Sequence, residues 1–271
     1  MMFDEAFRRD GYLLFERLFD PDLIAAIREA LIGKSGGVDP DNPPPNMRVY
    51  DGRLHMAAPL SGPLLDPFLY AHPLVMRVLE TLFEQRQFLI DNVALVTALQ
   101  GAPAMPVHKD HGPLFSSRPE LDAALPPYAI TLGIPLIPTD EKTGTTRIFA
   151  GSIGADYDEA NAQLSGDLSP VDMHVEPGGA FLMDYRVYHS GLANQSRQDR
   201  PILYIIYSRP WFTDIGNFET HSRLAITREG LASVPGEHRH LFRRVAAAGL
   251  IDDTIGALGL EHPSDEKKPS A

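Results

Sequence analysis

Cysteine is absent from this chain of 271 residues. Its absence excludes disulfide bonds, thiolate metal sites and cysteine nucleophiles, and it leaves histidine and carboxylate side chains as the candidate metal ligands. Long apolar runs are missing too, because no stretch approaches the roughly 18 residues that a membrane-spanning helix needs. We therefore expect no membrane partner.

Positive charge is scarce, because the chain has 24 Lys and Arg residues and 36 Asp and Glu residues, which gives a net charge of -12. This balance, without any basic run, argues against a nucleic-acid partner. Residues 1–5 are acidic and lack the apolar segment of a secretory signal. We expect a cytoplasmic protein with a small-molecule substrate, and the sequence leaves its oligomeric state open.

Residues 1–85 are predicted to be mainly helical. Asp20 can cap a helix that starts at Pro21, and Pro73 suits the first position of another. Between these helices, residues 35–52 are predicted to form a long loop, because the prolines of 39–46 disfavour both helix and central strand. Such a loop is either a lid over a binding site or a mobile linker.

After residue 85 the hydrophobic pattern changes from helical to extended. Short apolar segments separated by turn residues continue to residue 212, which is typical of a β barrel or sandwich backed by helices. We expect one domain over residues 1–260, with a β core at 86–212 and a C-terminal helical part at 213–260. A helix is predicted over residues 237–248, and 261–271 resemble a disordered tail.

His108 and Asp110 form the first candidate metal motif. Side chains two residues apart lie on the same face of an extended strand, so an imidazole nitrogen and a carboxylate oxygen can bind one metal ion. Lys109 and His111 would point to the opposite face. A histidine from a distant strand would complete the 2-His-1-carboxylate triad, which is typical of non-heme Fe(II) enzymes. The motif alone is equally consistent with a surface turn.

His189 and Arg200 supply the second half of the pattern. His189 precedes a Gly-containing turn, and Arg200 begins the next apolar strand, so a hairpin would bring the two side chains together. A guanidinium near the metal suits a dicarboxylate cosubstrate, whose far carboxylate takes two hydrogen bonds from it. Singly, each residue also fits an ordinary role, a core histidine and a surface charge.

Together these motifs resemble those of the phytanoyl-CoA dioxygenase family of Fe(II)/2-oxoglutarate-dependent oxygenases. The resemblance covers most of the chain and is strongest around His189, Gly191, Asn194, Ser196 and Arg200. It also includes the following segments: Asp10-Gly11-Tyr12, Leu18-Phe19-Asp20-Pro21, the His-x-Asp strand, and Gly144-Thr145-Thr146-Arg147 leading to Gly151-Ser152.

The resemblance implies a mainly β fold, a double-stranded β-helix (jelly roll, cupin-like) with N-terminal helices packed on the outside. It assigns His108, Asp110 and His189 to Fe(II), and Arg200 to the distal carboxylate of 2-oxoglutarate. Asn92 and Thr145 are further suggested contacts of this cosubstrate. Dioxygen would be the second cosubstrate.

Two departures from the family pattern affect what can be carried over. The family often has Pro-Gly-Ser-His where this chain has Ala150-Gly151-Ser152-Ile153, and an aromatic residue where it has Val107. Neither change touches a predicted metal ligand, but both prevent the transfer of a relative's substrate. Asp110 separates the chain from halogenating relatives, which lack this carboxylate.

The leading hypothesis is an enzyme that hydroxylates an unactivated C–H bond while 2-oxoglutarate becomes succinate and carbon dioxide. Desaturation, epimerisation and cyclisation are open outcomes of the same chemistry. The alternatives are a non-catalytic metal-binding jelly roll and a metal-dependent hydrolase with the same ligands, neither of which needs Arg200. The chain has no basic cluster for the phosphates of coenzyme A, so we favour a small or medium apolar metabolite or natural-product intermediate.

Overall fold

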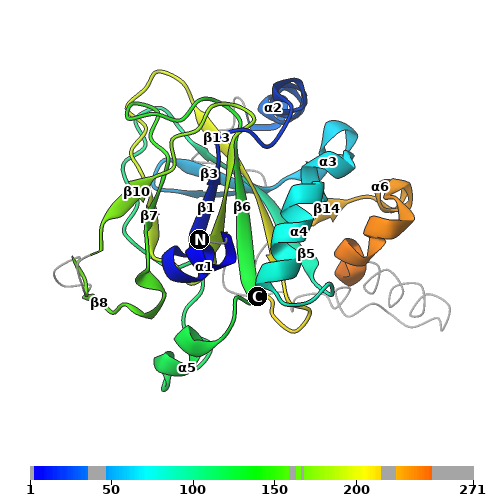
Figure 1. Ribbon diagram of the computed structural model, residues 1–271. Helices are drawn as coiled ribbons and strands as arrows, with labels where there is room; N and C mark the ends of the chain where they lie inside the picture. Colours follow the sequence, from blue (N-terminus) through cyan, green and yellow to red (C-terminus); the bar gives the residue numbers. More distant parts are fainter. Residues whose placement is uncertain (1–2, 36–46, 159–162, 166–167, 215–223, 246–271) are drawn as a thin grey trace, which may run out of the picture.

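A computed structural model describes residues 3–35, 47–158, 163–165, 168–214 and 224–245. Two antiparallel sheets dominate it (Figure 1). The large sheet has seven strands, in this order: β1 (Tyr12–Phe15), β11 (Ala180–Asp184), β6 (Ala129–Pro135), β13 (Arg200–Ser208), β5 (Leu89–Ala98), β3 (Arg53–Ala57) and β2 (Met47–Tyr50). The small sheet contains β10 (Pro170–Asp172), β7 (Thr146–Phe149) and β12 (His189–Gly191).

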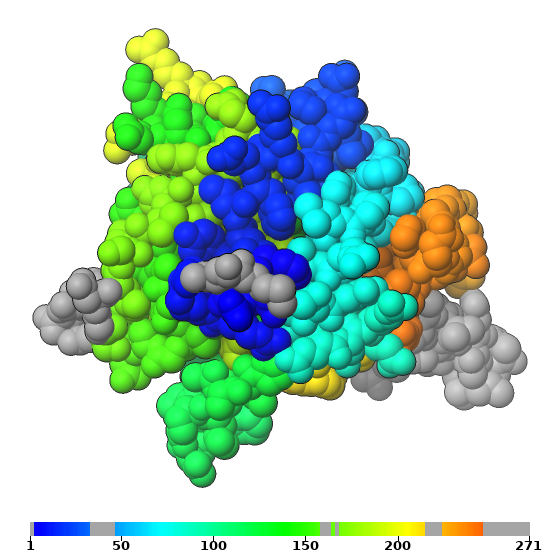
Figure 2. Space-filling model, in the orientation of Figure 1, coloured from blue at the N-terminus to red at the C-terminus, as the bar shows by residue number. Residues whose placement is uncertain are grey.

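Short elements complete the described chain. Two-residue strands form the pairs β4 (Pro59–Leu60) with β14 (Ala225–Ile226) and β8 (Tyr157–Asp158) with β9 (Gln163–Leu164). The helices are α1 (Phe3–Asp10), α2 (Pro21–Ser35), α3 (Pro67–Tyr70), α4 (Pro73–Leu82), α5 (Pro119–Ala124) and α6 (Arg228–Ser233), with 3-10 turns η1 (Gly62–Leu65), η2 (Ser152–Gly154) and η3 (Gly236–Phe242). The segment with α5 projects from the body of the molecule (Figures 1 and 2).

The large sheet is covered on both faces, and β13 shows how. Leu203, Ile205 and Tyr207 point into the main hydrophobic core, which they share with residues of α2 and α4. Arg200, Tyr204 and Ile206 alternate with them and face a cavity on the other side. One face of the strand therefore stabilises the fold, and the other carries polar groups into the cavity.

The mainly β, cupin-like fold with helices packed on its outside is confirmed. Within the predicted loop 35–52, however, β2 is a strand that pairs with β3, and β3 pairs with β5. The proline-rich residues 39–46 and the tail 261–271 lie outside the described residues. No described helix is both long enough and apolar enough to cross a bilayer.

The predicted C-terminal helix also differs from the structure. Over the described part of residues 237–248, the chain forms the 3-10 turn η3 up to Phe242 and is α-helical at residues 243–245. Residues 246–248 lie outside the described residues. Leu241 and Phe242 are fully buried in the main core, and the Phe242 ring meets Tyr70 edge-on at 5.2 Å between centroids. The described residues of the predicted helix are therefore helical, but the first turns are 3-10 rather than α.

Candidate metal centre

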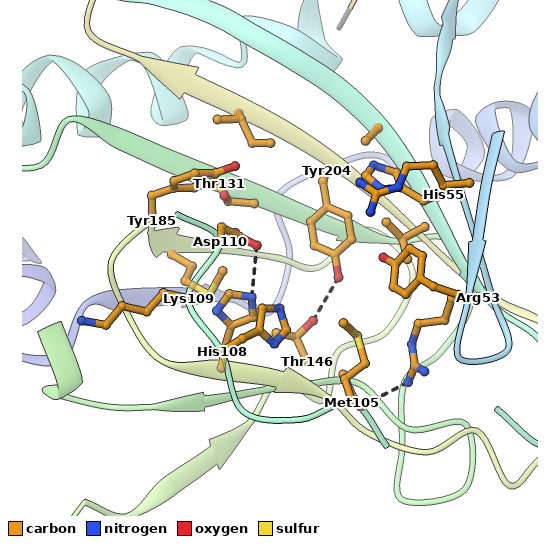
Figure 3. Close-up of a pocket in the computed structure, with 18 of the residues that line it drawn as sticks. Arg53, His55, Met105, His108, Lys109, Asp110, Thr131, Thr146, Tyr185 and Tyr204 are labelled. Atoms are coloured by element: carbon orange, nitrogen blue, oxygen red, sulfur yellow. Dashed lines mark hydrogen bonds and ion pairs between the residues drawn. The ribbon is translucent and has the colours of Figure 1, made fainter. Parts of the chain in front are cut away.

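His108 and His189 are paired across two segments of backbone. His108 lies in an isolated antiparallel bridge with His189 of β12, so its segment extends the small sheet beyond β12. Directly opposed residues of an antiparallel pair have side chains on the same face. The two imidazole rings accordingly lie side by side, with 4.5 Å between their centroids (Figure 3).

Each histidine ring is oriented by a carbonyl of its own segment. The Nδ1 atom of His108 lies 2.8 Å from the Pro106 oxygen, and Nδ1 of His189 lies 3.0 Å from the Val187 oxygen. A carbonyl can only accept, so each Nδ1 carries a hydrogen and Nε2 is the nitrogen of each ring that is available to a metal. This arrangement orients a metal-binding imidazole in many proteins.

Asp110 completes the cluster. Its Oδ1 atom is 3.4 Å from Nε2 of His189, and the ligand atoms of the three side chains all lie within 4.8 Å of one another. Burial opposes ionisation of the Asp110 carboxyl, but the adjoining His189 ring outweighs it and lowers the pKa below its ordinary value. Burial in turn opposes protonation of His189, but the Asp110 carboxylate outweighs it and raises the pKa of that ring. A metal ion would displace the proton from Nε2 of His189, so the carboxylate and the two imidazoles form a donor set that suits a divalent transition metal.

The cluster opens into a cavity of about 250 Å³ between the sheets. Its lining is apolar on one part and cationic on another. Ala94, Val96, Met183 and Ile206 supply apolar surface, whereas Arg200 enters from the first residue of β13. The cavity therefore provides one region for an anion and another for hydrocarbon.

Arg200 is a buried cation with only 4% of its surface exposed. Its Nε atom is buried without a hydrogen-bond partner in the described part of the chain. Burial lowers the pKa of the guanidinium, although an arginine remains charged at any physiological pH. A buried, unpaired guanidinium is costly, so the site fits an anionic ligand that supplies the missing acceptor.

Arg53 borders the same end of the cavity, from β3. It is 1% exposed, and its guanidinium donates to the carbonyl oxygens of Asp51 at 2.9 Å and of Gly191 and Leu192 at 3.2 Å each. It therefore connects β3 of the large sheet to β12, two residues from His189. Sequence reasoning missed Arg53 because β3 was not predicted.

Tyrosine hydroxyls supply the neutral polar groups of the cavity. The Tyr204 hydroxyl lies 3.1 Å from that of Thr146, near the centre of Figure 3. Burial raises the pKa of Tyr204, and it raises the pKa of Tyr50 to about 12. Both phenols stay protonated at neutral pH and can donate to an acceptor in the cavity.

Two predicted cosubstrate contacts do not line the cavity. Thr145 is fully buried, and its hydroxyl donates to the Met173 carbonyl, whereas the next residue, Thr146, faces the cavity. Asn92 is fully buried beside Ile206, its partner in the β5–β13 register, and its amide has no hydrogen-bond partner among the described residues. Their contact with a cosubstrate stays a prediction, and Thr146 is better placed than Thr145.

Asp184 has a structural role. Its carboxylate accepts hydrogen bonds from Nε and Nη2 of Arg186, both at 2.8 Å, in a buried two-pronged ion pair. Arg186 also donates to the carbonyl oxygens of Asp122 and Leu125, which anchors the α5 segment. The ion pair of Asp184 and Arg186 therefore stabilises the α5 segment, which follows the metal motif in the sequence.

Comparison with known proteins agrees with the fold and with the cluster. The sequence profile of the family described as phytanoyl-CoA dioxygenase (PhyH) matches residues 7–202. The chain therefore belongs to the phytanoyl-CoA dioxygenase family, and it is an Fe(II)/2-oxoglutarate-dependent oxygenase. The His108, Asp110 and His189 donor set fits the iron of this class, and the unpaired Arg200 fits its dicarboxylate cosubstrate.

Solved structures share the fold at low sequence identity. SnoN, a non-heme α-ketoglutarate-dependent epimerase from nogalamycin biosynthesis, is 15% identical with a TM-score of 0.58, over 76% of this chain and 81% of its own. The carbocyclase SnoK from the same biosynthesis is 18% identical with a TM-score of 0.57, over 81% and 90%. AviO1 from Streptomyces viridochromogenes Tue57 is 20% identical with a TM-score of 0.55, over 77% and 94%.

Proposed function

We propose that this chain hydroxylates an unactivated C–H bond of a small or medium-sized apolar metabolite or natural-product intermediate. His108, Asp110 and His189 would hold Fe(II), and Arg200 would pair with the distal carboxylate of 2-oxoglutarate. The observation that carries the proposal is the division of one cavity into the metal cluster, a buried guanidinium without a partner, and an apolar wall.

The protein's own groups prepare this site before any ligand arrives. Carbonyl oxygens of Pro106 and Val187 hold the two imidazoles with Nε2 toward the cavity, and the lowered pKa of Asp110 keeps its carboxylate ionised. When bound, iron and 2-oxoglutarate together with dioxygen supply the oxidising power for C–H cleavage, with succinate and carbon dioxide as coproducts. The side chains supply binding and orientation.

The apolar wall supports an apolar substrate. Ala94 and Val96 of β5 and Ile206 of β13 present hydrocarbon to the cavity, and Met183 adds an adaptable thioether. The volume of about 250 Å³ lies just under the usual range of ligand pockets, about 300–1,000 Å³. A substrate larger than a small metabolite would therefore extend through the mouth of the cavity.

Hydroxylation is proposed over epimerisation or ring closure, although the names of SnoN and SnoK show that this fold also serves those reactions. A screen of metabolite pools for substrate-dependent succinate formation would identify the substrate, and mass spectrometry of the product would identify the reaction. A gain of one oxygen atom is the expected result. A loss of two hydrogens would indicate desaturation or cyclisation instead. An unchanged mass would indicate epimerisation.

The oxygenase chemistry itself has a direct test. Fe(II) and 2-oxoglutarate added without oxygen should give the weak visible charge-transfer band of the chelate, and no band should form with succinate in place of 2-oxoglutarate. A protein that binds Fe(II) without this band would contradict the proposal and favour a hydrolase. A cytoplasmic location, expected from the lack of cysteine, is part of the proposal and is testable by cell fractionation.

A further inference from the structure

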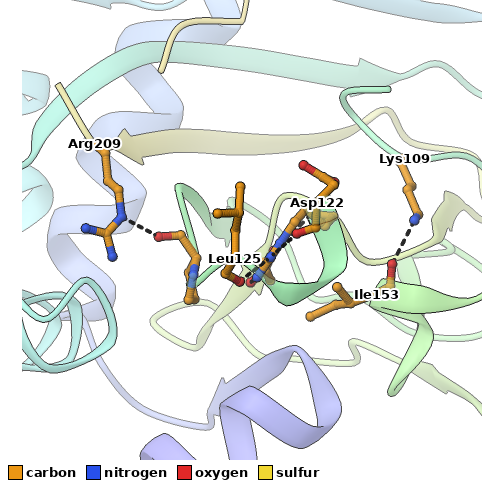
Figure 4. A network of polar contacts seen from close by, with 8 residues as sticks. Lys109, Asp122, Leu125, Ile153 and Arg209 are labelled. Carbon is orange, nitrogen blue, oxygen red and sulfur yellow. Dashed lines mark hydrogen bonds and ion pairs between the residues drawn. The ribbon is translucent and has the colours of Figure 1, made fainter. Parts of the chain in front are cut away.

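Lys109 lies between two predicted metal ligands in the sequence, and its side chain points away from the metal cluster. The side chains of His108 and Asp110 point into the cavity, and the Lys109 side chain points away from them (Figure 3). Its ammonium donates to the carbonyl oxygen of Ile153 in η2 at 2.9 Å, a contact drawn in Figure 4. The long side chain thus connects the metal segment to a distant turn.

The same ammonium also lies over an aromatic ring. Nζ of Lys109 is 4.4 Å from the centroid of the Tyr188 ring, within the range of a cation–π interaction. Tyr188 immediately precedes the ligand His189. Lys109 therefore touches the strand that carries the third ligand, from the side opposite to the metal.

Tyr188 is itself held in place. Its backbone N–H donates to the Ser152 hydroxyl at 2.9 Å, and its carbonyl accepts from the N–H of Phe149 at 2.9 Å. The ring of Tyr157 lies against its ring, with centroids 5.6 Å apart. Lys109 consequently docks on a rigid surface made by η2, the end of β7 and the start of β12.

The backbone of the metal segment pairs with β12 along one edge, and the Lys109 side chain adds an attachment on another side. Met105 donates to the Gly191 oxygen at 2.8 Å, and His108 exchanges hydrogen bonds with His189. In the part of the chain that the structure describes, no strand pairs with its outer edge. A chain fixed along one edge can rotate about that edge, which would carry Asp110 away from the two rings.

We propose that Lys109 is a positioning residue that holds the segment of His108 and Asp110 against Tyr188 and Ile153, and so sets the geometry of the metal centre. The inference rests on the proposed iron site.

Metal affinity is the direct readout. Groups that orient ligands without touching the metal typically change affinity by about 10-fold to 100-fold when removed. We expect Lys109→Met, which keeps the aliphatic stem and loses the charge, to weaken Fe(II) binding by a factor in that range. Anaerobic competition against a chromophoric chelator measures this without cosubstrate. Lys142→Met, at an exposed lysine, is the matched control and should bind as the wild type does.

Variants of the partner separate positioning from general stability. Tyr188→Leu should weaken Fe(II) binding by less than Lys109→Met does, because it leaves the hydrogen bond of Lys109 to the Ile153 carbonyl in place. The double variant should bind Fe(II) no more weakly than Lys109→Met, because the loss of the Lys109 ammonium already removes its contact with the Tyr188 ring. Tyr188→Phe and Lys109→Arg keep the ring and the cation, so both should retain most of the affinity. Thermal unfolding of the metal-free proteins shows whether each variant folds.

Two results would overturn the inference. One is a folded Lys109→Met protein with wild-type Fe(II) affinity, and the other is a double variant whose losses simply add. Failure of the proposed function is a separate result, because it leaves Fe(II) binding intact and removes the band with 2-oxoglutarate. The two hypotheses can therefore fail independently.

Discussion

His108 and His189 exchange both of their backbone hydrogen bonds, N–H to carbonyl in each direction, at 2.9 Å. Two ligands that are 81 positions apart in the sequence are therefore adjacent through the backbone itself, since 189 minus 108 is 81. The closely paired geometry of this bridge turns both rings to one face, where Asp110 joins them. The metal centre therefore depends on the register of the paired segments as well as on the types of its residues.

Replacement of Asp110 is the most direct test of the metal centre. Asp110→Ala should abolish succinate formation and weaken Fe(II) binding, because it removes the only carboxylate in the cluster. The fold should persist, since the carboxylate borders a cavity. Circular dichroism checks the fold, and a coupled succinate assay checks activity. Near-wild-type turnover by the purified variant would refute the iron assignment, and His108→Ala and His189→Ala should behave as Asp110→Ala does.

Local sequence patterns were sufficient for the parts of the site that depend on strand alternation. His108 and Asp110 share a face because side chains alternate, and Arg200 begins the strand that follows His189, as predicted. The predicted hairpin between the two strands is wrong, because β12 belongs to the small sheet and β13 to the large one. Local patterns do not predict which segments pair with one another. Nothing in the sequence around His108 indicates that its neighbour is His189, because register is decided by contacts between segments that are far apart in the chain.

Arg53 shows where sequence reasoning stopped. Its strand β3 is only five residues long and begins directly after the predicted loop 35–52, in a part of the chain predicted to be mainly helical. The strand forms because it can pair with both β2 and β5, which a local pattern does not reveal. A buried arginine that binds three carbonyls also has no sequence signature, since most arginines are exposed.

Gly191 is the point where Arg53 and the metal segment meet. A Cβ at this position would lie 3.1 Å from Sδ of Met105 and 3.4 Å from Nη2 of Arg53, so Met105 would have to shift and Arg53 would be left in tight contact. Gly191→Ala should therefore cost about 1–3 kcal/mol of stability, as overpacking does, and should weaken Fe(II) binding because β12 carries His189. Gly236→Ala, with nothing within 4 Å, is the control. Urea unfolding and chelator competition would show the difference, and equal behaviour of the two variants would contradict it.

The buried pair of Asp184 and Arg186 yields a stability prediction. Their side chains are 1% and 4% exposed, so Arg186→Met would leave a buried carboxylate without its cation. Loss of one partner of a buried pair typically costs about 3–5 kcal/mol. Arg118→Met breaks the exposed pair with Glu120 and should cost at most about 1 kcal/mol. Urea unfolding of both variants compares them, and similar small losses would show that the buried pair contributes little.

Arg200 is the residue on which the choice of an oxygenase depends most. If its guanidinium binds the distal carboxylate of 2-oxoglutarate, truncation to alanine should cost about 2–5 kcal/mol, because the carboxylate loses a buried charged partner. At about 1.4 kcal/mol per factor of ten, the apparent KM for 2-oxoglutarate should rise roughly 30-fold to several-thousand-fold. Titration of 2-oxoglutarate in the succinate assay measures this change.

Two comparisons make the Arg200 prediction specific. Arg200→Lys should recover only part of the loss, since an ammonium cannot make the planar two-pronged contact. Fe(II) affinity without cosubstrate should change little in either variant, because Arg200 lies outside the group of His108, Asp110 and His189 that could hold the metal. An Arg200→Ala enzyme with unchanged dependence on 2-oxoglutarate would show that the buried guanidinium serves another anion, and the apolar wall and cationic end of the cavity would then have to be assigned to a different substrate.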